Sequence, residues 1–126
     1  MHTRAVAYLE LATAAGILGF WVLFFAGAMS SPDGSSWFLA HEHAFVAPDI
    51  VLAGVLLGAA IQLLREKPSG RTLSLLAAGA LVFLALYDFG FEVSIGFDRT
   101  PSDRLTTTIM DLWLLGLGGL LALRRY

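Results

Sequence analysis

Four long apolar stretches dominate the chain, and short polar segments separate them. The stretches cover residues 5–29, 48–64, 72–97 and 101–123. A helix needs about 20 residues, mostly apolar, to cross a hydrocarbon core of about 30 Å, and three of the stretches reach that length. The second stretch is shorter, which tilt or an upstream extension would accommodate. The pattern predicts an all-α integral membrane four-helix bundle, with residues 1–126 as a single transmembrane domain.

Proline and glycine mark the expected helix boundaries. The segment 65–71 contains Pro68 and Gly70, which are helix breakers, so the third helix is expected to begin at Thr72. Pro101 is expected to open the fourth helix, because proline is favoured at the first helical position. Residues 37–47, in the long first connection, form either an interfacial helix or an extension of the second helix.

Composition supports the membrane class and excludes several functions. Hydrophobic residues make up 57% of the chain and charged residues only 14%, against about 25% in soluble domains. The expected partner is therefore the lipid bilayer. The net charge of −2 and the lack of a basic stripe argue against nucleic acid binding. With no cysteine, the chain cannot form disulfides or thiolate metal sites.

The distribution of lysine and arginine predicts an orientation. Short cytoplasmic loops carry an excess of these residues. One side of the predicted bundle has six of them and the other side has two. This asymmetry predicts a multi-pass protein of the cytoplasmic membrane with both termini in the cytoplasm. The six are Arg4, Arg65, Lys67, Arg71, Arg124 and Arg125, and the two are Arg99 and Arg104.

Small and polar residues form a stripe on each helix, as expected for packing between membrane helices. The stripe on the second helix contains Asp49, Ala53 and Ala60. The third helix has Ser74, Ala78, Leu81, Ala85, Asp88 and Glu92, and the fourth has Thr107, Thr108, Asp111, Leu115, Gly118 and Ala122.

The first helix carries Ala12, Gly16, Gly19 and Gly27 along one face, which is a candidate interface for a homo-oligomer. Glu10 lies roughly opposite that face. It either points into the protein or reaches the cytoplasmic interface.

Acidic residues inside the apolar stretches define the candidate site. Asp88 and Glu92 are four residues apart, so they project from the same side of a helix. A carboxylate in a bilayer is costly and usually faces the protein interior or a wet cavity. We expect several acids to line one outward-facing intramembrane cavity with aromatic walls. The expected ligand-binding residues are Asp88, Glu92, Asp111, Asp49, Glu42, Tyr87 and Trp113.

Clustered carboxylates in a low dielectric cannot all ionise, so they carry protons or bind a cation. Oxygen ligands suit a hard divalent cation, whereas His41, His43 and Glu42 would shift the preference toward zinc or iron. An organic cation or a lipid ammonium group would also suit acids beside aromatic rings.

Three classes of function stay open. The first is binding of a cation, or of a cationic or lipidic ligand, with proton coupling. The second is a membrane-embedded enzyme that acts on a lipid or isoprenoid substrate, with Asp88 or Asp111 as its catalytic acid. The third is a non-catalytic accessory subunit of a larger membrane complex.

The segment Glu42-His43-Ala44-Phe45, followed by Asp49 and by Leu86-Tyr87-Asp88 in the next helix, resembles small uncharacterised four-helix bacterial membrane proteins. This resemblance covers residues 37–96 and implies no activity. The plan of helices with buried His, Glu and Asp is also similar to the emopamil-binding, sterol isomerase-like group, without a residue-by-residue match. Small multidrug resistance transporters likewise have four helices and an acid in the first helix, where Glu10 lies in this chain. They lack the group of outward-facing acids and the long first loop that are expected here.

Overall fold

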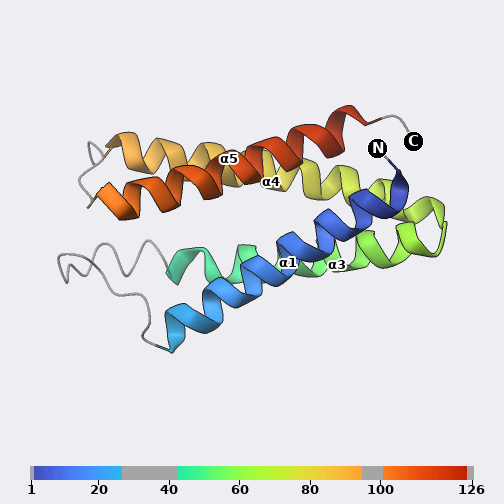
Figure 1. The fold of residues 1–126 in the computed structure, drawn as a ribbon, viewed down its shortest axis with the longest axis horizontal. Coiled ribbons are helices and arrows are strands. Elements are labelled where there is room, and N and C mark those ends of the chain that lie inside the picture. Colours follow the sequence, from blue (N-terminus) through green and yellow to red (C-terminus); the bar gives the residue numbers. More distant parts are fainter. Residues whose placement is uncertain (1, 27–42, 95–100, 125–126) are drawn as a thin grey trace. The chain divides into compact units, whose positions relative to one another are not determined.

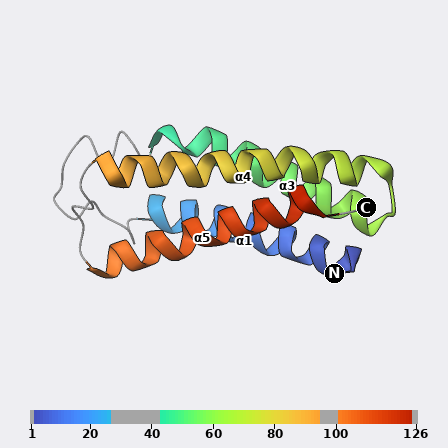
Figure 2. The same ribbon diagram turned by 90° about the horizontal axis from the view of Figure 1, so that it is seen from above.

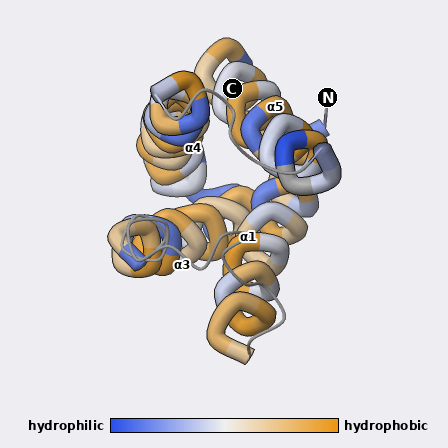
Figure 3. The backbone as a smooth tube through the Cα atoms, turned by 90° about the vertical axis from the view of Figure 1, so that its left-hand side faces the viewer, coloured by the Kyte–Doolittle hydropathy of each residue, from blue (hydrophilic) through white to orange (hydrophobic). Residues whose placement is uncertain are grey.

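The computed structural model describes residues 2–26, 43–94 and 101–124, except the side chain of Asp103, and all its elements are helices. These are α1 (Thr3–Phe25), α3 (Val46–Leu64), α4 (Pro68–Ser94) and α5 (Pro101–Leu123) (Figure 1). Each contains a segment long and apolar enough to cross a membrane, and hydrophobic residues are visible in every helix (Figure 3). The prediction of an all-α protein with four membrane-spanning helices is confirmed.

The chain divides into two compact units, and the boundary in the sequence lies between Leu73 and Ser74. In the first unit, α1 and α3 pack side by side and run antiparallel (Figures 1 and 2). Their buried positions recur mainly at intervals of three and four, the spacing of residues on one face of a helix. Many of these residues are small, which lets the backbones approach. They are Val6, Ala7, Glu10, Thr13, Ala14 and Trp21 in α1, and Leu52, Ala53, Leu56, Ala59, Ala60 and Leu63 in α3.

In the second unit, α5 packs antiparallel to α4 (Figure 2). Gly118 marks the close approach of the two helices. A Cβ atom placed on Gly118 would lie 2.8 Å from Val82 Cγ2 and 3.1 Å from the Ala78 carbonyl oxygen. Only glycine leaves room for this contact. The same three-and-four spacing marks the buried residues, which are Ser74, Ala77, Ala78, Leu81, Ala85 and Glu92 in α4 and Leu117, Gly118 and Leu121 in α5.

A tight turn joins α3 to α4. Glu66 adopts a left-handed conformation with φ of 57°. Its N–H donates to the Leu63 carbonyl at 3.0 Å, and the Lys67 N–H donates to the Gln62 carbonyl at 2.9 Å. These two bonds form a Schellman motif, which caps the last carbonyls of α3. The left-handed position normally favours glycine, and here it is occupied by a glutamate.

The predicted start of α4 at Thr72 is wrong, because α4 begins four residues earlier at Pro68. Proline at the first helical position loses no hydrogen bond, since that N–H has no partner within the helix. Gly70 is also part of the first turn, where a Cβ atom would lie 2.7 Å from the Leu63 backbone nitrogen. The two supposed helix breakers therefore shape the first turn of α4.

The other helix boundaries are close to those expected. α5 spans the predicted residues 101–123, and α3 begins two residues before the predicted start at Pro48. His43 and Ala44 are helical, and a turn at Phe45 separates them from α3. The rest of the 37–47 segment lies outside the described residues, as do the predicted ends of the first helix at 29 and the third at 97.

The predicted stripes on α3 and α4 agree with the observed burial. Asp49 and Asp88 are half-buried, and the other predicted stripe residues of these two helices are buried. On α5 the prediction is partly wrong: Gly118 is buried and Thr107 and Asp111 are half-buried, but Thr108, Leu115 and Ala122 are exposed. The buried face of α5 instead follows the three-and-four spacing through Leu117, Gly118 and Leu121.

Candidate functional site

Glu92 and Asp88 lie on the buried stripe of α4. Glu92 is buried, with only 3% of its surface exposed to solvent. Asp88, one turn earlier, is half-buried. Ala85 and Leu81 continue the same stripe in the preceding turns and are buried. The two acids therefore lie on the packed side of a helix that is apolar enough to cross a membrane, as the sequence predicted.

The antiparallel packing of α4 and α5 places Asp111 level with Asp88. Gly118 is in contact with Leu81, whose Cβ atom would be 3.2 Å from a Cβ on Gly118. Asp88 comes seven residues after Leu81, and Asp111 comes seven residues before Gly118. Because both helices rise about 1.5 Å per residue, the two aspartates lie at about the same height along the pair. Asp111 is half-buried, like Asp88.

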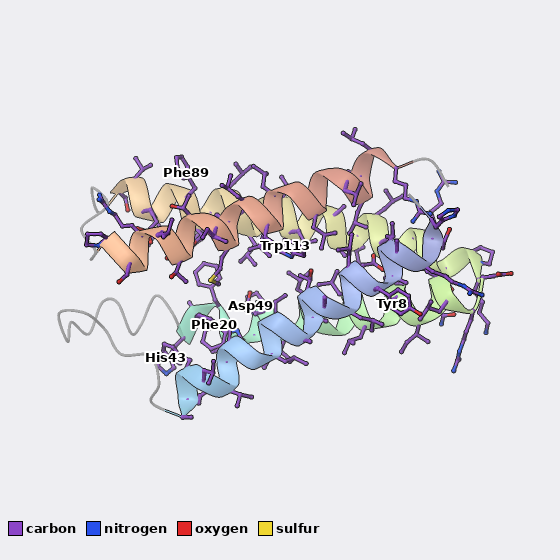
Figure 4. All side chains as sticks on the ribbon, in the orientation of Figure 1. Tyr8, Phe20, His43, Asp49, Phe89 and Trp113 are labelled. Atoms are coloured by element: carbon purple, nitrogen blue, oxygen red, sulfur yellow. The ribbon has the colours of Figure 1, made fainter. Side chains whose placement is uncertain are left out.

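The two aromatic residues expected to line the site are each about half exposed. Tyr87 is 52% exposed and Trp113 is 48% exposed. The ring of Tyr87 lies beside that of Phe83, one turn earlier on α4, with centroids 6.4 Å apart. Figure 4 shows Trp113 on α5 and Phe89 on α4 within this second unit.

Asp49, in the first unit, has a defined structural partner. The indole N–H of Trp21 donates a hydrogen bond of 2.9 Å to Asp49 Oδ2. Trp21 is only 4% exposed, and a buried indole N–H generally requires an acceptor. The bond joins the last turns of α1 to the first turn of α3. This pair was not predicted from the sequence.

Aromatic rings surround the Trp21 indole. Phe20 and Phe24 both pack edge-on against it, with centroids 5.1 and 5.2 Å away. The ring of His43 lies edge-on to Phe24 at 5.6 Å and to Phe25 at 5.9 Å. Figure 4 shows Phe20, His43 and Asp49 at the end of the first unit where α1 ends and α3 begins. His43 therefore contributes to an aromatic cluster.

Glu10 is a second buried carboxylate within a membrane-spanning helix. Its surface is 0% exposed, so of the two roles left open by the sequence, the structure shows the one directed into the protein. Ala12 and Gly16, on the opposite face of α1, are exposed and Gly19 is half-buried, whereas Gly27 lies outside the described residues.

Among the described residues, no three histidine, aspartate or glutamate side chains are close enough to hold a metal ion. Glu92, Asp88 and Asp111 therefore do not form a ready-made metal centre. His41 and Glu42, two of the three expected metal ligands, lie outside the described residues.

The fold and these acids define a multi-pass, all-α integral membrane protein with four candidate spans and carboxylates within them. No family model, curated protein or solved structure matches the chain.

Proposed function

We propose that this protein binds a cation at the buried Glu92 of α4, with Asp88 one turn earlier and Asp111 on α5 contributing negative charge nearby. The observation that carries the proposal is the burial of Glu92, at 3% exposure, inside a membrane-spanning helix. A carboxylate in such a place is costly to keep charged, and intramembrane acids commonly mark ion, proton or ligand sites. The ligand is either an inorganic cation or the ammonium group of an organic or lipidic molecule.

Proton coupling follows from the same arrangement. A buried carboxylate in a low dielectric is costly to keep charged, and Glu92 is almost completely buried. A cation that binds at Glu92 therefore competes with a proton for this carboxylate. Binding is accompanied by proton release.

The proposal places Glu92, Asp88 and Asp111 toward the outer face of the cytoplasmic membrane, with both termini in the cytoplasm. Its support is the excess of lysine and arginine at one side of the spans. Within the first unit, Arg4 and Lys67 lie at the same end, because α1 begins where α3 finishes (Figure 1).

Proton release on cation addition tests this function. The purified full chain in detergent would be mixed with Mg²⁺, Ca²⁺ or tetraphenylphosphonium in weak buffer containing a pH-sensitive dye. We expect at least one cation to release protons from the wild type, and Glu92→Gln to abolish the release. Glu66→Gln is the matched control, because Glu66 is an exposed carboxylate in the α3–α4 turn. Release that is absent for all three cations, or unchanged in Glu92→Gln, contradicts the proposal.

A second candidate site rests on Glu10, which is fully buried in the apolar helix α1. A single acid within the first membrane helix suits exchange of a proton for a lipophilic cation. The variant Glu10→Gln distinguishes the two sites in the same assay. Loss of release in Glu10→Gln with full release in Glu92→Gln places cation binding in α1.

A further inference from the structure

We propose that the basic end of the first unit, formed by Arg4, Arg65, Lys67 and Arg71, binds the phosphate headgroups of anionic phospholipids. This inference does not depend on the cation site of the α4–α5 pair. All four side chains are exposed. The described residues 2–5 and 64–72 contain these four cationic side chains and a single carboxylate, that of Glu66. This end therefore carries an excess of positive charge.

The Trp21–Asp49 hydrogen bond fixes which residues share this end. Arg4 comes 17 residues before Trp21, and Glu66 comes 17 residues after Asp49. Since antiparallel helices rise equally, about 1.5 Å per residue, Arg4 lies at the height of Glu66. The α1 terminus and the α3–α4 turn are together at one end of this unit in both ribbon views (Figures 1 and 2).

The turn holds two of the cations in a defined geometry. Arg65 and Lys67 flank Glu66, the residue at the left-handed position of the Schellman motif. Gly70 lies so close to α3 that a Cβ atom would be 2.7 Å from the Leu63 nitrogen, which keeps the turn compact. The cations are therefore presented from a short, hydrogen-bonded loop, which reduces the backbone ordering needed on binding.

The basic end lies where the membrane-spanning helices α1 and α3 end, and this location favours lipid headgroups as its partner. Spans that cross a bilayer place their ends in the headgroup layer, where lipid phosphates are abundant. Tyr8, 60% exposed on α1 near this end, is the type of residue enriched at membrane interfaces (Figure 4). Anionic lipids attract lysine and arginine near the surface, with an effect of about fivefold in affinity per cation.

Native mass spectrometry of the full chain in detergent tests the proposal. The protein would be titrated with dioleoylphosphatidylglycerol and, separately, with dioleoylphosphatidylcholine. We expect tighter binding of the anionic lipid. The double variant Arg65→Gln/Lys67→Gln should weaken that binding about 25-fold, from about fivefold per cation. The matched control is Arg104→Gln, which removes an exposed arginine at the start of α5 and should leave binding unchanged.

Three results would overturn the proposal. Equal affinity for the two lipids would remove the headgroup preference. An equal loss in Arg104→Gln would show only an effect of total charge. Displacement of the lipid by inorganic phosphate, at matched ionic strength, would assign the site to free phosphate. Circular dichroism of each variant verifies that its helices are retained, and the single variants Arg65→Gln and Lys67→Gln replace the double variant if it misfolds.

Discussion

Replacing Gly118 with alanine tests the α4–α5 packing on which the height of Asp111 depends. The new Cβ atom would lie 2.8 Å from Val82 Cγ2 and 3.1 Å from the Ala78 carbonyl oxygen. The Val82 side chain is branched at Cβ and has one strongly preferred rotamer in a helix, and the Ala78 oxygen belongs to the backbone. The helices must therefore move apart, and overpacking of this kind costs about 1–3 kcal/mol.

Gly116→Ala is the matched control, because a Cβ atom on Gly116 meets nothing within 4 Å. Both substitutions gain the same helix propensity, about 0.5–1 kcal/mol. That gain cancels in the comparison, so Gly118→Ala should be less stable than Gly116→Ala by about 1–3 kcal/mol. Unfolding in a titration with dodecyl sulfate, followed by circular dichroism, measures this difference. Equal stability of the two variants would contradict the described contact and remove the basis for placing Asp88 and Asp111 at one height.

Two further predictions concern the first unit. A double-mutant cycle with Trp21→Phe and Asp49→Ala should give a coupling free energy of about 1 kcal/mol, the usual net contribution of one hydrogen bond, including those between membrane helices; additive effects would show that the 2.9 Å bond contributes nothing. Glu66→Gly should stabilise the protein by about 0.5–1 kcal/mol, because relief of the left-handed strain exceeds the entropic cost of glycine. Glu66→Val should destabilise it in the same unfolding assay, and the reverse order would be inconsistent with the φ of 57°.

The helices are predictable because a membrane allows few alternatives. Each spanning segment must satisfy its own backbone hydrogen bonds, so length and hydropathy identify it almost completely. The start of α4 was misplaced because Pro68 and Gly70 are breakers inside a helix but are well tolerated in its first turn. The buried face of α5 was only partly predicted, since small and polar residues lie on more than one side and packing against α4 selects among them.

The candidate site also has features that the sequence predicts and features that it does not. The shared face of Asp88 and Glu92 follows from their spacing within one helix, which the sequence contains directly. The Trp21–Asp49 bond joins residues 28 positions apart, so the spacing within a helix does not reveal it. A signal was nevertheless present, since an indole N–H in an apolar helix needs an acceptor and Asp49 begins the helix that packs against it.

Asp49 and Glu92 are expected to differ in role, because Asp49 accepts a hydrogen bond from Trp21. One Asp49 oxygen accepts the indole N–H, so this carboxylate contributes to the packing of α1 on α3. Glu92 is almost completely buried, and Asp88 and Asp111 lie at one height on the α4–α5 pair. Burial of a carboxylate is costly wherever it occurs, so a structural acid should be tolerant of an isosteric amide, whereas a cation site should not. Asp49→Asn should therefore preserve cation-linked proton release, and Glu92→Gln should abolish it; loss of release in Asp49→Asn would contradict a purely structural role for Asp49.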